Sequence, residues 1–127
     1  MDEQNKVIIY TASDGQTKID VKLEDETLWL TQAQMCELYQ TSRTNVVEHI
    51  KHIYEEGELD KEATCRNFRQ VREEGGRKVE REMTFYNLDM IIALGYRVRS
   101  IIATRFRQWA TLRLKEYMVK GFTLDDE

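Results

Sequence analysis

Hydrophobic and polar residues alternate along the first thirty positions, which is the period of a β-strand with one buried face. Residues 7–10 (VIIY) are β-branched and aromatic, and three apolar residues alternate with polar ones over residues 19–23. Asp14 and Gly15, between these runs, form a turn signal typical of hairpins. The pattern therefore predicts an N-terminal β-hairpin, followed by a short strand at Thr27–Leu30.

The pattern changes to a helical one after Leu30. Thr31 and Gln34 have the spacing of a capping box, and Leu30 and Met35 occupy the positions of a hydrophobic staple. We expect a helix that runs to about Tyr39. Its expected buried residues are Ala33, Leu38, and either Cys36 or Met35.

A second helix is predicted after a turn of only three residues, Gln40–Ser42, which is short enough to force a sharp angle between the helices. Ser42 is a favourable N-cap. Gly57 can take the left-handed conformation that ends a helix near Glu56. The apolar positions of this helix recur at helical spacing and are Val46, Val47, Ile50 and Ile53.

A second, strongly charged hairpin is predicted from Cys65 to Tyr86, with its bend at Glu74–Gly76. The spacing from Phe68 to Val71 breaks strict alternation, as a β-bulge would. The basic residues along this hairpin are Arg66, Arg69, Arg72, Arg77, Lys78 and Arg81.

Two further helices complete the predicted elements. Asn87 is the expected cap of a short helix over Leu88–Leu94, stopped at Gly95, and a long helix is expected from Ser100 to about Lys120, closed by Gly121. The expected buried stripe of the long helix is Phe106, Trp109, Ala110, Leu114, Tyr117 and Met118.

These elements predict one compact domain in three parts. Residues 1–30 form the hairpin and short strand, residues 31–86 the helix pair and charged hairpin, and residues 87–127 the C-terminal helices. Because the chain ends directly after its last helix, we expect it to be the N-terminal part of a longer protein.

The order of helix, tight turn, helix and charged hairpin is that of a winged helix-turn-helix. The predicted fold class is therefore α+β, a winged helix-turn-helix with an N-terminal β-hairpin and a long C-terminal helix. In such folds the second helix, here about Ser42–Glu56, offers its first side chains to base edges in the DNA major groove. The candidates for base recognition are Ser42, Arg43, Thr44 and Asn45. The candidates for phosphate contact are Arg69, Arg72, Arg77, Lys78, Arg97 and Arg99.

The net charge of −4 at first argues against a nucleic-acid partner, but the charge is unevenly distributed. Residues 1–60 carry −8, residues 61–121 carry +7 and the last six residues carry −3. A local basic surface, rather than the sum, steers a polyanion. Four acidic residues would repel phosphate if they faced the duplex, but they lie at the far end of the second helix: Glu55, Glu56, Glu58 and Asp60.

Two segments, FYNLDMIIALGYRVRS and RFRQWAT followed by LKEYMVKGF, resemble the RhuM family of bacterial virulence-associated proteins, which is similar to phage antirepressor-type DNA-binding modules. The resemblance covers about residues 28–127. It implies a winged-helix-like module, followed in longer members by a C-terminal region, and it implies no known reaction. Together with the element order, it makes double-stranded DNA the expected partner and transcription regulation the expected role.

Catalytic chemistry has little support in the sequence. His49 and His52 share a helix face, but zinc needs three or four converging ligands, and the chain has no CxxC motif. No phosphate-binding glycine loop is present either, since EEGGRK is better explained as a hairpin bend. We expect no enzyme activity, no catalytic residues, no cofactor and no metal.

The alternative function is a protein–protein interaction or dimerisation module without DNA affinity. The long last helix has more apolar surface than one buried stripe requires, and a homodimer or another protein partner would cover it. The residues expected at that interface are Ile101, Ile102, Leu112 and Val119. No apolar run approaches the roughly 20 residues that cross a bilayer. Two cysteines without a disulfide framework fit a reducing cytoplasm, which is the expected location.

Overall fold

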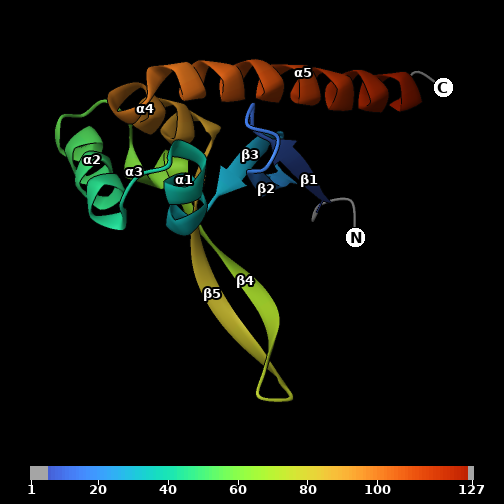
Figure 1. Cartoon of the computed structure of the whole chain (residues 1–127). Helices are drawn as coiled ribbons and strands as arrows, with labels where there is room; N and C mark the ends of the chain where they lie inside the picture. Colours follow the sequence, from blue (N-terminus) through green and yellow to red (C-terminus); the bar gives the residue numbers. More distant parts are fainter. Residues whose placement is uncertain (1–5, 126–127) are drawn as a thin grey trace.

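The computed structural model describes residues 6–125, and the side chains of residues 6–117 within them. These residues form an α+β fold with a five-stranded antiparallel sheet and five helices (Figure 1). In chain order the elements are β1 (Lys6–Thr11), β2 (Lys18–Glu24), β3 (Thr27–Leu30), α1 (Gln32–Tyr39), α2 (Arg43–Glu55), α3 (Lys61–Thr64), β4 (Cys65–Glu74), β5 (Arg77–Asn87), α4 (Leu88–Val98) and α5 (Ser100–Asp125).

The strands lie in the order β1-β2-β3-β5-β4, and every neighbouring pair is antiparallel. β3 pairs with β5 only at Trp29↔Asn87 and Leu30↔Tyr86, whereas β4 and β5 pair along ten positions. The β4–β5 ribbon (residues 65–87) therefore extends well past the rest of the sheet. Figure 1 shows it projecting away from α4 and α5.

The core lies on one face of the sheet. The strand register places inward-facing apolar residues of β2, β3 and β5 on the same side, and the helices cover that side. α1 contributes Met35 and Leu38, while α5 contributes Phe106, whose ring lies 5.0 Å from that of Tyr10 on β1. The sheet residues of this core are Tyr10, Ile19, Val21, Leu23, Leu28, Leu30 and Tyr86.

A separate aromatic cluster occupies the opposite face at the base of the ribbon. The ring of Phe68 makes edge-to-face contacts with those of Trp29 and Phe85, with centroids 5.3 Å apart in each pair. The Arg66 guanidinium lies 4.7 Å from the centre of the Trp29 ring and forms an ion pair with Asp25. Edge-to-face and cation–π contacts of this kind add to the stabilisation from apolar burial, so this cluster stabilises the junction between the ribbon and the sheet.

The predicted strands and helix starts are largely confirmed. The N-terminal hairpin forms, and β3 and α1 occupy the predicted residues. The capping box is present, because Thr31 Oγ1 accepts from the Gln34 backbone N–H and the Gln34 side chain accepts from the Thr31 N–H.

Two predicted core residues are wrong. Ala33 is exposed, because α1 turns Met35 and Leu38 to the core, and Ala33 lies on its outer side. Val47 is 40% exposed, because Val46, Ile50 and Ile53 already fill the face of α2 that meets α1 and α4.

The later elements also depart from the predictions. The β4–β5 register is continuous, so the expected bulge is absent, and Phe68 and Val71 simply point to opposite faces. α4 continues through Gly95 to Val98, and α5 continues through Gly121 to Asp125. The single-turn helix α3 was not predicted. In the long helix, Phe106 and Ala110 are buried, while the side chain of Met118 lies outside the described residues.

Candidate nucleic-acid interface

The start of α2 is built by the turn that precedes it. Gln40 takes the left-handed conformation (φ 54°) that ends α1, and the Ser42 Oγ accepts a 3.0 Å hydrogen bond from the Asn45 backbone N–H. The Asn45 side-chain amide donates to Thr41 Oγ1 at 2.8 Å. Ser42 and Asn45 therefore hold the helix start in place, in addition to any role in recognition.

The first turn of α2 presents a mixed surface to solvent. Arg43 and Thr44 are exposed, and Arg43 forms no hydrogen bond or ion pair with the described residues. Val47 follows one turn after Arg43 and is also exposed, so its methyl groups belong to the same surface. The exposure of Val47 was not evident from its spacing, because adjacent helical residues can both be buried, as Leu38 and Tyr39 are in α1.

The continuous register sorts the ribbon charges by face, because paired residues lie on one face and successive residues alternate. The basic face, with four arginines and one glutamate, has a net charge of +3. The acidic face, with two basic and three acidic residues, has −1. The charges of the basic face are Arg66, Arg72, Glu74, Arg77 and Arg81. Those of the acidic face are Arg69, Glu73, Lys78, Glu80 and Glu82.

Ion pairs within the ribbon use some of these charges. Arg81 donates twice to Glu74, at 2.9 and 2.7 Å, and Arg69 lies 3.6 Å from Glu80. Near the tip, Arg72, Arg77 and Lys78 form no ion pair with the described residues. Gly75 and Gly76 make the two-residue turn, with φ of 58° and 79°, a conformation that glycine adopts without strain.

Arg97 is already paired with carboxylates, because it joins α4 to the end of α2. It donates to Glu56 at 2.7 Å and to Glu58 at 2.9 Å. This hydrogen-bonded guanidinium lowers the pKa of Glu56 below its ordinary value. The pairing holds the acidic end of α2 beside α4, away from the ribbon. Arg99, the C-cap residue of α4, is exposed.

The six predicted phosphate contacts therefore do not form one surface. Arg69, Arg72, Arg77 and Lys78 lie on the ribbon but on two different faces, whereas Arg97 and Arg99 lie at the end of α4. Figure 1 places α4 and the ribbon tip on opposite sides of the sheet region.

Residues 63–127, from α3 onward, match the Virulence protein RhuM family. The chain belongs to this family. The match includes the β4–β5 ribbon, α4 and α5 of this RhuM family member but not α1 or α2. No curated protein and no solved structure matches it. None of its described helices is long and apolar enough to cross a membrane.

The predicted partner residues of this RhuM family member separate into two groups. Ile101 and Leu112 are 66% and 62% exposed on α5, as a docking residue would be. Ile102 is partly buried against the core and lines a pocket described below. The side chain of Val119 lies outside the described residues.

The two histidines on α2 do not assemble a metal centre with their described neighbours. His52 Nε2 lies 4.0 Å from Glu48, while His49 Nδ1 is buried and has no hydrogen-bond partner in the described part of the chain. No three His, Cys, Asp or Glu side chains among the described residues converge as metal ligands.

Proposed function

We propose that this RhuM family member is a DNA-binding regulator that catalyses no reaction, and that α1, α2 and the β4–β5 ribbon act as a winged helix-turn-helix. The observation that carries this proposal is the ribbon, which projects from the domain and has its charges sorted into a basic and an acidic face. A projecting basic surface is suited to the phosphate backbone.

In this proposal the first turn of α2 enters the major groove. The exposed guanidinium of Arg43 can contact guanine O6 and N7, and the methyl groups of Thr44 and Val47 can contact thymine. Asn45 can contact adenine only if its amide leaves Thr41 Oγ1, so Arg43 is expected to contribute most to discrimination. One bidentate contact contributes about 1–3 kcal/mol of discrimination.

The pairing of Arg97 with Glu56 and Glu58 supports this orientation of α2. It keeps two carboxylates engaged at the far end of the helix and leaves the N-terminal turn as the end that approaches DNA. The partial positive charge of a helix N-terminus also favours phosphate there.

The basic face of the ribbon supplies the proposed phosphate contacts. Arg72 and Arg77 lie on that face near the tip, whereas Lys78 and the ion-paired Arg69 lie on the acidic face. Phosphate contacts position a protein on the duplex without selecting sequence. Arg72 and Arg77 are therefore expected to strengthen binding to all duplexes.

The first experiment selects bound sequences from a random-duplex library at two salt concentrations and then measures affinities for the enriched site. Arg43→Ala is expected to reduce discrimination by about 1–3 kcal/mol at one base pair. Arg72→Ala with Arg77→Ala is expected to weaken binding to all duplexes. It should also reduce the slope of log affinity against log salt concentration by the amount that about two phosphate contacts contribute.

The matched control is Arg69→Ala with Lys78→Ala, which removes the same charge from the acidic face and is expected to have a smaller effect. Equal losses of duplex affinity in the two double variants would contradict the assignment of the phosphate contacts to the basic face. No retention of any duplex by the unmodified chain at low salt would contradict DNA binding itself.

A second candidate function is self-association through α5, in addition to DNA binding or in its place. Ile101 and Leu112 are 11 residues apart, about three helical turns, so they lie on one side of α5. Both are more than half exposed. A dimer formed there would bury them, and it would present two copies of α2 to two half-sites.

A further inference from the structure

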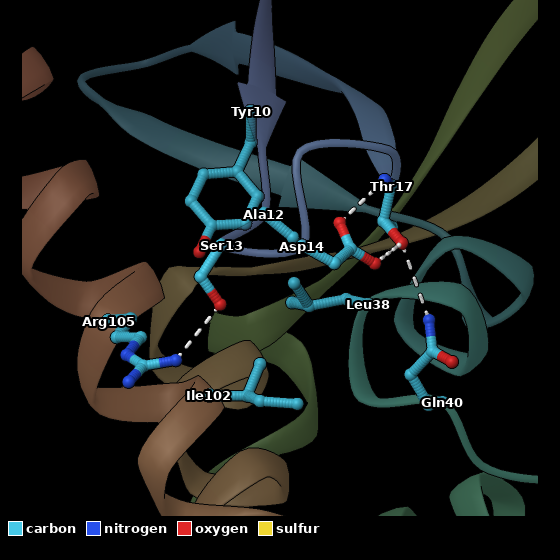
Figure 2. Close-up of a pocket in the computed structure, with 9 residues that line it drawn as sticks. All are labelled: Tyr10, Ala12, Ser13, Asp14, Thr17, Leu38, Gln40, Ile102 and Arg105. Carbon is cyan, nitrogen blue, oxygen red and sulfur yellow. Dashed lines mark hydrogen bonds between the residues drawn. The ribbon is translucent and has the colours of Figure 1, made fainter.

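A pocket of about 300 Å³ lies between the β1–β2 loop, the end of α1 and α5. Figure 2 shows its side chains converging from these three segments, which are far apart in the sequence. The volume is at the lower end of the range found for small-molecule sites. The proposed contacts with DNA make no use of this pocket.

The interior of the pocket is apolar. Leu38 and the Tyr10 ring belong to the buried core, and Ile102 packs against that core from α5. These side chains come from α1, β1 and α5, so the packing of the domain fixes their positions. They form a surface on which a compact apolar group can rest.

The rim of the pocket is polar and carries one available cation. The Arg105 guanidinium donates a 3.0 Å hydrogen bond to Ser13 Oγ, a neutral partner, and it forms no ion pair with the described residues. A guanidinium has five N–H donors in a planar fork that matches a carboxylate. Most of the Arg105 donors therefore have no partner among the described residues and can bind a ligand.

The nearby carboxylate of Asp14 is already engaged and does not compete for Arg105. It accepts hydrogen bonds from the backbone N–H groups of Gln16 and Thr17, at 2.8 and 2.9 Å, and from the Thr17 hydroxyl at 2.7 Å. Figure 2 shows it pointing toward Thr17 rather than toward Arg105. The hydrogen bonds from Thr17 and Gln16 lower the pKa of Asp14.

We propose that this pocket binds a small organic carboxylate with a ring-sized apolar body. The carboxylate pairs with the Arg105 guanidinium, and the body packs on Leu38, Ile102 and the Tyr10 ring. The Ser13 hydroxyl, which now accepts from Arg105, can turn its own O–H to the ligand. A neutral or cationic compound of the same shape would leave the guanidinium without a charged partner and bind more weakly.

The test is a titration of the whole chain with benzoate, followed by ¹H–¹⁵N NMR, with benzyl alcohol as the neutral isostere. Benzoate is expected to give saturable shifts confined to residues 10–17, 38–40 and 102–105, with the millimolar affinity usual for a compound of its size. Benzyl alcohol is expected to bind at least about tenfold more weakly, because it lacks the charged hydrogen bonds.

Two variants of α5 make the test specific. Arg105→Ala is expected to lower the affinity for benzoate at least about tenfold. Arg107→Ala is the matched control: Arg107 is also exposed on α5, its Nε donates to the Tyr96 hydroxyl at 3.2 Å, and it does not line the pocket. Arg105→Lys keeps the charge but loses the planar fork of donors. Its affinity for benzoate is expected to lie between those of the unmodified chain and of Arg105→Ala.

Three results would overturn the proposal. One is the absence of saturable shifts with benzoate in the folded chain. Another is equal binding of benzoate and benzyl alcohol. The third is an equal loss of benzoate affinity in Arg105→Ala and Arg107→Ala, which would show that only the net charge of the chain affects binding. None of these measurements uses DNA, so they test the pocket independently of the proposed function.

Discussion

Gly95 lies in the last turn of α4, against Tyr39 of α1 and Ala103 of α5. A Cβ atom added there would overlap the Tyr39 hydroxyl and lie 2.6 Å from the Ala103 Cβ. The Tyr39 hydroxyl donates a 2.6 Å hydrogen bond to the Ile91 carbonyl oxygen, and burial raises the pKa of Tyr39, so this hydroxyl keeps its proton. The contact leaves no room for a methyl group.

Gly95→Ala is therefore expected to lower the free energy of unfolding by about 1–3 kcal/mol, the usual cost of overpacking a core. The gain in helix propensity, about 1 kcal/mol, offsets part of this cost. Denaturant unfolding followed by circular dichroism measures the change. Gln108→Ala, at an exposed position on α5, should change stability by less than about 0.5 kcal/mol. Unchanged stability of Gly95→Ala would mean that α1 and α4 can move apart freely.

At the scale of single elements, Ser42 separates the stability of α2 from its proposed contact with DNA. Ser42→Ala removes the acceptor for the Asn45 N–H and is expected to destabilise the chain by about 1 kcal/mol. Ser42→Asp keeps a side-chain acceptor at the N-cap and should retain stability, but it adds a negative charge where DNA is proposed to bind.

Thermal unfolding and duplex-binding measurements on both variants make this comparison. Normal stability with weakened DNA binding in Ser42→Asp is the expected combination. Normal DNA binding in Ser42→Asp would place the helix start away from the duplex.

Local signals made most of the elements predictable from sequence. The Asp14–Gly15 turn, the caps at Thr31, Ser42 and Asn87, and the alternation in β2 each depend on residues within a few positions of one another. Gly95 was misjudged because glycine after an apolar helix usually marks a helix end. Here its role is set by Tyr39, which is 56 positions earlier in the chain.

The candidate site was predictable only in part, for the same reason. The exposed first turn of α2 follows from its cap and its apolar spacing. The pairing of Arg97 depends on Glu56 and Glu58, about 40 residues away, and the sorting of the ribbon charges depends on the strand register. The pocket is assembled from three distant segments, so no single stretch of sequence indicates it.

At the scale of the whole molecule, α5 is the surface on which self-association can be tested. Leu112→Glu places a charge at the exposed apolar position and is expected to weaken a dimer at least about tenfold. Thr111→Glu adds the same charge to the adjacent exposed residue, which faces a different side of α5, and should have a smaller effect.

Sedimentation equilibrium over a range of protein concentrations measures both variants. An unmodified chain that remains monomeric at the highest concentration would remove α5 as a self-association surface. Equal effects of Leu112→Glu and Thr111→Glu would mean that the added charge, rather than the apolar contact, is responsible.

The continuous pairing of β4 and β5 also limits how the ribbon can change in evolution. Past its base, the ribbon pairs only with itself in the described part of the chain, so its length can vary without disturbing the core. A residue inserted into one strand alone would move every side chain beyond it to the other face and mix the basic residues with the acidic ones. Insertions and deletions in relatives are therefore expected to add or remove two residues in each strand, which keeps both the pairing and the face of every side chain.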